Sequence, residues 1–144
     1  MEPRRRQTRR ASPADTDLGR ASARAGVLAA NDAFYRAMRD GDYAAMDRLW
    51  ARRRPVTCTH PDWKMLVGRR AVMNSWRLVL LDHLPPDIWP VSAHAVVTGS
   101  TAMVICTERV EGVELVAANT FVREGARWRL LNHQSIAAGE VAEP

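Results

Sequence analysis

The spacing of apolar residues predicts three helices in the first 81 residues. From Val27 onward, apolar positions recur at steps of three and four and form one stripe, until Gly41 ends the helix. Asp42 is placed to cap a second, short helix whose apolar side chains point inward. A third helix is predicted over residues 69–81. Its buried stripe consists of Val72, Met73, Trp76, Val79 and Leu80.

Alternating and β-branched segments predict five strands. Residues 56–60 form a short strand that places Val56, Cys58 and His60 on one face. Four longer strands follow the third helix, separated by glycine-containing turns typical of consecutive antiparallel hairpins, at residues 91–97, 102–110, 113–122 and 127–135. Helices followed by a strand meander indicate an α+β fold, with the helices covering one face of a curved sheet.

The chain divides into a leader, a domain and a short tail. Residues 1–26 hold seven arginines against three acidic residues, and thus four of the five net positive charges. Because this segment has almost no large apolar residue, we expect a disordered, solvated Arg-rich leader. A transit peptide and a nucleic-acid-binding arm remain open alternatives for it. The domain is expected over residues 27–136 and a C-terminal tail over residues 137–144. Nucleic acid is not an expected partner of the nearly neutral domain.

Composition narrows the class of protein further. With 144 residues and 47% hydrophobic content, the chain has the size and balance of one globular domain. It contains no apolar run of the roughly 18 to 20 residues that a membrane-spanning helix needs. The two cysteines, Cys58 and Cys106, are too few for a disulfide scaffold and fit a reducing compartment. We therefore expect a cytoplasmic protein without membrane contact.

Several short motifs resemble those of one known family. The segment Phe34-Tyr35-Arg36-Ala37-Met38-Arg39-Asp40-Gly41-Asp42 is followed by His60-Pro61-Asp62-Trp63, Gly68-Arg69 and Ser75-Trp76. Asn119-Thr120-Phe121 and Trp128-Arg129-Leu130-Leu131 complete the set. From Val27 to Ser135 the chain thus resembles the SnoaL-like branch of the nuclear-transport-factor-2-like superfamily, also called ketosteroid-isomerase-like.

This resemblance implies a fold but not one reaction. It implies a cone-shaped α+β barrel, in which three N-terminal helices pack on a strongly curved, mainly antiparallel sheet and leave a cavity. Members often form homodimers through the sheet, and they include isomerases, polyketide cyclases, dehydratases, association domains and transport adaptors. The acid and base positions of the isomerase, cyclase and dehydratase do not transfer to this sequence, so the fold alone selects no chemistry.

Two histidines are the candidate catalytic residues. His60 ends the short strand on the face of Cys58, and an imidazole at a cavity mouth can act as a general base. The alternative is a structural histidine that holds the following turn. His133 lies in the last strand on the face of Leu131 and Ser135, where polar groups need a cavity or an interface. An exposed strand end is its alternative.

Six further residues are candidates for the cavity wall. Glu108 is in phase with Val104 and Cys106, and burial there would raise its pKa. Asn119 lies on an apolar strand face, where its amide needs a partner. The remaining candidates are Tyr35, Cys58, Trp63 and Trp76; the two tryptophans offer flat walls for a planar apolar ligand, and core packing is the alternative for Trp76.

The sequence predicts a small-molecule protein without a cofactor. No metal-ligand spacing, phosphate-binding loop or hydrolase elbow is found in the 144 residues, so neither a metal nor a nucleotide cofactor is expected. The first hypothesis is binding of a small apolar or planar organic ligand, with proton transfer of the isomerase, cyclase or dehydratase type. The second is a non-catalytic association or adaptor module that dimerises through its sheet. An open pocket with His60 and another titratable group favours the first.

Overall fold

The computed structural model describes residues 13–139, which form three helices and six strands. The helices are α1 (Pro13–Asp40), α2 (Tyr43–Leu49) and α3 (Arg69–Leu81). Two short strands, β1 (Thr57–Thr59) and β2 (Leu66–Val67), lie between α2 and α3 in the chain. Four long strands follow: β3 (Ile88–Thr98), β4 (Thr101–Val110), β5 (Val113–Glu124) and β6 (Arg127–Ala137).

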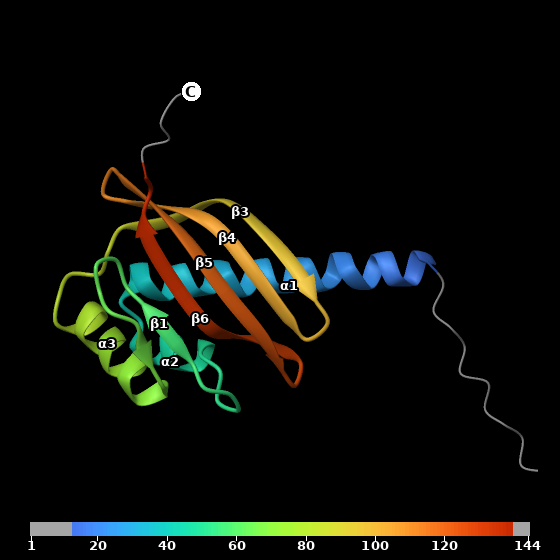
Figure 1. Cartoon of the computed structure of the whole chain (residues 1–144), viewed down its shortest axis with the longest axis horizontal. Coiled ribbons are helices and arrows are strands. Elements are labelled where there is room, and N and C mark those ends of the chain that lie inside the picture. The colour runs from blue at the N-terminus through green and yellow to red at the C-terminus, as the bar shows by residue number, and fades with distance from the viewer. Residues whose placement is uncertain (1–12, 140–144) are drawn as a thin grey trace, which may run out of the picture.

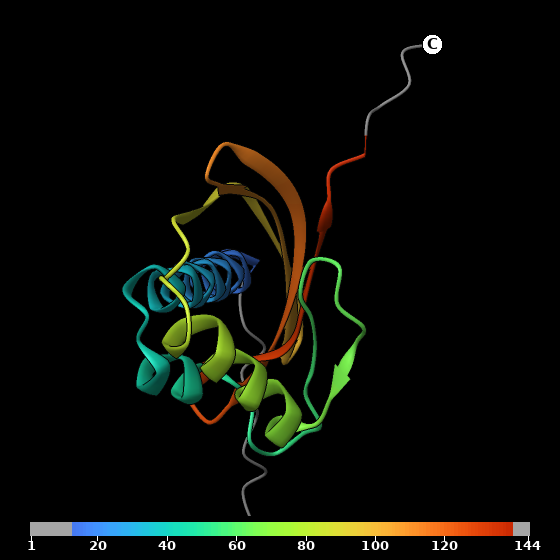
Figure 2. The same ribbon diagram turned by 90° about the vertical axis from the view of Figure 1, so that its left-hand side faces the viewer.

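All six strands belong to one open sheet with the order β2-β1-β6-β5-β4-β3. Every pairing is antiparallel except that of β1 with β6, which is parallel, so the sheet is mixed and mainly antiparallel. The sheet bends strongly, and the three helices lie on its concave side (Figures 1 and 2). The predicted α+β class with three helices on a curved sheet is confirmed.

The helices begin and end where local chemistry dictates. The Asp42 carboxylate accepts a hydrogen bond from the backbone N–H of Ala45 at 2.9 Å, and so caps α2 as predicted. Gly41 has a φ of 61°, a conformation that side-chain-bearing residues rarely adopt. A Cβ atom at this position would stand 2.9 Å from Pro85, so glycine is also required for close packing. The predicted bounds of α3 agree with the observed ones.

Helix α1 starts earlier than the apolar pattern predicted. It begins at Pro13, so the expectation of a disordered leader up to residue 26 is wrong for residues 13–26, and residues 1–12 lie outside the described part of the chain. Side-chain burial begins only at Val27, whereas the side chains of residues 17–26 are mostly exposed. Alanine and arginine have a high helix propensity that does not depend on burial. The helix can therefore continue past the edge of the sheet (Figure 1).

Two strands carry an extra residue that changes which side chains face the core. In β6, Phe121 pairs with Leu130 and Thr120 pairs with Asn132, so Leu131 is the extra residue. Leu130, and not Leu131 as predicted, therefore shares the inner face with His133. In β3, the register shifts between Val91 and His94, where Ser92 has a φ of 53°. Both bulges increase the bend of the sheet around the helices.

The core fills the space between the helices and the concave face. Its largest buried side chains are aromatic, and Phe34 packs edge-on against Trp76 with 5.5 Å between ring centroids. Tyr35, Trp50 and Phe121 are equally buried. No helix within residues 13–139 has both the length and the apolar character needed to cross a membrane.

Candidate functional site

A cavity of about 270 Å³ lies between the helices and one end of the sheet. Its walls come from α1, α3, the loops after β1 and before β3, the start of β3 and the inner faces of β4, β5 and β6. Most lining side chains are apolar or aromatic, while four carry polar groups: His60, Glu108, His133 and Ser135. The other lining residues are Met38, Pro61, Trp63, Trp76, Val79, Pro86, Ile88, Val110 and Leu115. A mainly apolar cavity with a few polar groups is typical of a small-molecule site.

His60 lies at the end of β1 and is held by α3. Its Nε2 is 2.9 Å from the Ser75 hydroxyl and 3.8 Å from Cys58 Sγ. The Ser75 hydroxyl donates to the backbone carbonyl of Val72 at 2.6 Å, so it accepts from the imidazole. Burial lowers the pKa of His60 to about 4. The ring is therefore neutral at pH 7.

His133 is buried in β6 and belongs to a polar network that runs across the sheet to α1. Its Nδ1 donates to Asn119 Oδ1 at 2.6 Å. The Asn119 amide nitrogen in turn donates to Asn31 Oδ1 at 2.8 Å and to the Tyr35 hydroxyl at 3.0 Å. Burial first, and then the nearby His60, lower the pKa of His133 to about 3. This second ring is also neutral at pH 7.

Glu108 places a carboxyl group in the cavity wall. The side chain is 1% exposed, and its Oε1 has no hydrogen-bond partner among the described residues. The Ser135 hydroxyl, which also lines the cavity, lacks a partner in the same part of the chain. Burial is the main cause that raises the pKa of Glu108, and the nearby hydroxyl groups of Ser135 and Tyr35 oppose this shift only in part. Unpartnered buried polar atoms in a cavity are suited to a ligand that completes their hydrogen bonds.

Aromatic side chains surround both imidazoles. Trp76 is 1% exposed and lies edge-on to His60 with a centroid separation of 4.7 Å; its indole N–H has no partner among the described residues. Trp63 is 43% exposed and also packs edge-on against His60, with 4.8 Å between the ring centroids. Trp76 therefore forms an inner wall and Trp63 an outer one.

The structure brings five of the eight candidate residues into the cavity wall. These five are His60, His133, Trp63, Trp76 and Glu108. Tyr35, Cys58 and Asn119 are fully buried and lie behind the wall, where they support the lining side chains. Burial raises the pKa of Tyr35, and it raises that of Cys58 to about 12, so both groups are protonated at neutral pH.

Sequence reasoning did not assign a role to Asn31, Ser75 or Ser135. Asn31 lies four residues after Val27 and four before Tyr35, on the apolar stripe of α1. Ser75 follows Val72 by three residues and so lies on the stripe of α3. A small polar residue within an apolar helix stripe could have indicated these roles, because a buried polar group requires a hydrogen-bond partner.

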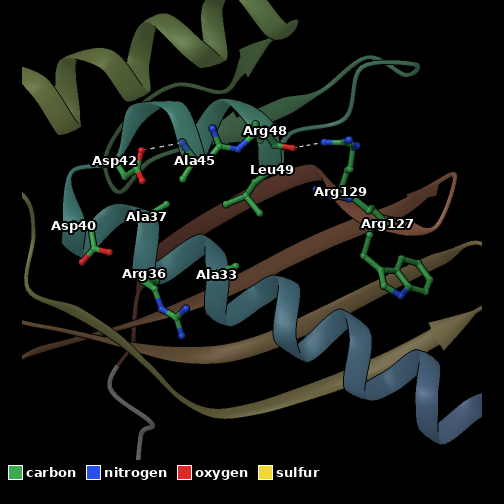
Figure 3. A pocket seen from close by; sticks show the side chains of 11 residues that line it. Ala33, Arg36, Ala37, Asp40, Asp42, Ala45, Arg48, Leu49, Arg127 and Arg129 are labelled. Atoms are coloured by element: carbon green, nitrogen blue, oxygen red, sulfur yellow. Dashed lines mark hydrogen bonds between the residues drawn. The ribbon is translucent and has the colours of Figure 1, made fainter.

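A second cleft of about 280 Å³ lies at the surface between α1, α2 and the β5–β6 hairpin (Figure 3). Arginines and aspartates line it together, among them Arg36, Arg48 and Asp40. The Arg129 guanidinium donates to the backbone carbonyl of Arg48 across one side. Its charged groups are mostly exposed and of both signs, so we place the candidate site in the mainly apolar cavity lined by His60 and Glu108 instead. Within residues 13–139, no three metal-ligating side chains are grouped to hold an ion.

Comparison with known proteins agrees with this fold. The model of the SnoaL-like domain family matches residues 27–139. An α+β domain with helices on the concave side of a bent sheet is the class of protein that the geometry defines. The chain belongs to the SnoaL-like family.

Solved structures and one curated protein are similar to the chain. A candidate dehydratase of the NTF2-like family from Streptomyces avermitilis is 32% identical, with a TM-score of 0.77; the match covers 83% of this chain and 98% of that one. A candidate association domain of calcium/calmodulin-dependent protein kinase type II from Thiobacillus denitrificans is 26% identical, with a TM-score of 0.69, over 78% and 94% of the two chains. The F-box protein SKIP8 of Arabidopsis thaliana is 26% identical over 111 residues, which are 76% of this chain. The match spans about half (48%) of that curated relative.

Proposed function

We propose that the cavity binds a small organic molecule and transfers a proton on it, in a reaction of the isomerase, cyclase or dehydratase type. The observation that carries the proposal is a buried carboxyl group with an unpartnered oxygen, in the same apolar cavity as two neutral imidazoles. Similarity to a candidate dehydratase supports it. So does the open cavity, which combines His60 with a second titratable group.

Glu108 is the proton-transfer group in this proposal, and the histidines orient the substrate. At neutral pH an imidazole with a pKa of about 4 is a weak base, which argues against His60 as the main base. Burial instead raises the pKa of Glu108, so its carboxylate is a stronger base than that of an exposed glutamate. The apolar walls exclude water, and so they strengthen every electrostatic contact with the reacting atoms.

Hydrogen–deuterium exchange tests this role before the natural substrate is known. A planar apolar ketone, 2-tetralone, carries acidic protons next to its carbonyl group and serves as the probe. We expect the wild-type protein to accelerate deuterium uptake from D₂O. Glu108→Gln keeps the shape but cannot accept a proton, so the rate should fall by about 10²–10⁴-fold, while binding of 2-tetralone persists. Asp87→Asn, at an exposed acidic residue outside the cavity wall, is the control.

Two results would contradict the proposal. If 2-tetralone binds to the wild type without accelerated exchange, the proton-transfer role is wrong. If the cavity-filling substitution Val79→Trp leaves the binding of 2-tetralone unchanged, the cavity is not the binding site. Mass spectrometry of molecules that copurify with the wild type, but not with Val79→Trp, would identify the natural ligand.

A second candidate function, an association module, rests on the outer face of the sheet. Apolar side chains from neighbouring strands are 39–53% exposed there: Val96, Met103, Ile105 and Val116. Such a patch is typical of a protein interface. We propose that two copies pair through this face as a homodimer in the cytoplasm, where the buried free thiols of Cys58 and Cys106 stay reduced.

Light scattering after size exclusion tests the homodimer. The wild type should elute at twice the monomer mass. Ile105→Glu should yield folded monomers, because a charge in the centre of the patch cannot be buried in the interface. Leu84→Glu, at an exposed residue of the α3–β3 loop, should leave the mass unchanged. A monomeric wild type at micromolar concentration would contradict this proposal and leave the cavity proposal unaffected.

A further inference from the structure

The hydrogen bonds of His60 fix which of its ring nitrogens carries the proton. The Ser75 hydroxyl has one proton, and it donates that proton to the Val72 carbonyl. It can therefore only accept from His60, at 2.9 Å, so Nε2 carries the hydrogen. In a neutral ring the other nitrogen, Nδ1, then keeps its lone pair. It has no hydrogen-bond partner among residues 13–139.

His133 is fixed in the opposite tautomer. Asn119 directs its amide oxygen at Nδ1 of this ring, at 2.6 Å, so Nδ1 carries the hydrogen. The amide oxygen of Asn119 can only accept a hydrogen bond. The amide nitrogen cannot take its place beside the ring, because it donates to Asn31 and Tyr35. Nε2 of His133 therefore keeps its lone pair, and no described residue donates to it.

Both free nitrogens are thus hydrogen-bond acceptors on rings that line the same cavity. The two rings line it together, with their centroids 6.4 Å apart. Burial keeps both rings neutral at pH 7. None of the described residues that line the cavity is a lysine or an arginine. Glu108 is the one acidic residue among them. The cavity therefore lacks a positive charge to compensate a buried anion.

We propose that the cavity selects uncharged planar molecules with two hydroxyl groups, which donate to His60 Nδ1 and His133 Nε2, and that it rejects carboxylates. Ser75 and Asn119 are positioning residues, because each acts on the ligand only through the tautomer of a histidine. This inference rests on the proposed cavity function and names its substrate class.

The tautomers are measured first, without any ligand. Long-range ¹H–¹⁵N correlation spectra of the full chain distinguish a protonated ring nitrogen from one with a lone pair. At pH 7 we expect the Nε2–H form for His60 and the Nδ1–H form for His133, with the exposed His83 and His94 as references in the same spectrum. The opposite tautomer in either ring, or a doubly protonated ring, would overturn the inference.

Three probes of similar size then test the ligand class. Resorcinol carries two hydroxyl donors, 1,3-dimethoxybenzene has the same skeleton without donors, and benzoate is an anion. We expect resorcinol to shift the ¹⁵N signals of both rings and to bind at least about tenfold more tightly than the other two, because they leave the ring nitrogens unpaired. Equal binding of 1,3-dimethoxybenzene overturns the ligand class but not the cavity function. If none of the three perturbs either ring, both are overturned.

Substitution of a positioning residue separates its role from general packing. Ser75→Ala removes the acceptor for Nε2–H, so the fraction of His60 in the Nδ1–H form should rise and the affinity for resorcinol should fall about tenfold toward that of 1,3-dimethoxybenzene. A loss of packing alone would weaken both probes equally. Asn74→Ala, at an exposed residue of α3, is the control. An unchanged tautomer and affinity in Ser75→Ala would overturn the role of Ser75.

Discussion

At the residue scale, the cavity depends on side chains whose protonation differs from that in water. Burial lowers the pKa values of His60 and His133 and raises that of Glu108, so in each case the neutral form is favoured. One nitrogen of each ring donates a hydrogen bond, His60 Nε2 to the Ser75 hydroxyl and His133 Nδ1 to Asn119 Oδ1. Buried polar groups that lack some of their hydrogen bonds reduce the stability of the folded protein, and they remain free to form hydrogen bonds with a ligand.

The two buried histidines predict a loss of stability in mild acid. Their pKa is about 6.5 when unfolded and about 4 or 3 when folded, so between these values the unfolded state binds more protons. The free energy of unfolding should therefore be unaffected by them above pH 6.5 and fall as the pH decreases from 6.5 toward 4. His60→Gln should reduce the slope of this fall by about 1 kcal/mol per pH unit.

Urea denaturation at half-unit steps from pH 7 to pH 4.5 measures this slope. The matched control is His94→Gln, because that ring is exposed to solvent in the folded protein. It should follow the wild-type curve. Wild type and His60→Gln with parallel curves would show that His60 does not stay neutral in the folded state.

At the element scale, a single carboxylate attaches the loop after α2 to the β5–β6 hairpin. Glu124 accepts hydrogen bonds from the backbone N–H groups of Arg52 and Arg53, the shorter at 2.7 Å, and pairs with Arg129 at 3.4 Å. Although burial of the carboxyl group opposes the shift, these contacts lower the pKa of Glu124. The carboxylate therefore contributes most above its unfolded pKa and loses this contribution as the pH falls through its folded pKa.

Glu124→Ala should lower the free energy of unfolding at pH 7 by about 1–3 kcal/mol, because two backbone donors lose a charged acceptor. Thermal or urea denaturation measures the change. Glu114→Ala breaks the exposed pair with Arg109 and should cost less than about 1 kcal/mol. Equal losses in the two variants would contradict the anchoring role of Glu124.

Helix α1 combines a packed half with an exposed N-terminal extension, and proline distinguishes the two. Ala21→Pro lies where side chains are exposed, so it should remove some helical circular dichroism and change the unfolding free energy by less than about 1 kcal/mol. Ala29→Pro lies beside buried residues and should cost about 3 kcal/mol or more. If both variants unfold alike, the extension contributes to the cooperative core.

Periodicity predicted most elements because burial there follows one face. The buried stripe of α3 and the shared inward face of Cys106 and Glu108 could be predicted from local spacing alone. The early start of α1, the two-residue β2 and the extra residue Leu131 were missed. Helix extension depends on propensity rather than burial, while a bulge and a two-residue strand are determined by pairing with distant segments.

The candidate site was predictable in part for the same reason. In-phase positions indicated that His60, Glu108 and His133 face inward, but alternation does not say which inward groups share a cavity. The hydrogen bond between Asn119 and Asn31 joins residues 88 positions apart, which no local pattern contains. The tautomers follow from such contacts and therefore required the structure.

At the scale of the whole molecule, the bent sheet leaves a cavity that stability alone does not require. Wrapping helices around one concave face buries most apolar side chains, but Glu108 Oε1 and Ser135 Oγ remain buried without partners in the described part of the chain. A group of this kind lowers the stability of the free protein by about 1–3 kcal/mol. Retaining such groups is consistent with a trade-off between stability and binding.

Glu108→Met should therefore stabilise the free protein while it removes the proposed activity. An apolar side chain of similar volume replaces a carboxyl group with an unpartnered oxygen, so the free energy of unfolding should rise by about 1–3 kcal/mol at pH 7. Because burial raises the pKa of Glu108, the wild type loses stability as the pH rises from about 4.5 through the folded pKa, and the variant does not. The difference between the two proteins should thus be larger at pH 8 than at pH 4.5, and Ser135→Ala should shift stability in the same direction without this pH dependence. A variant that is less stable than the wild type at pH 8 would mean that the carboxyl group is needed for folding rather than for a ligand.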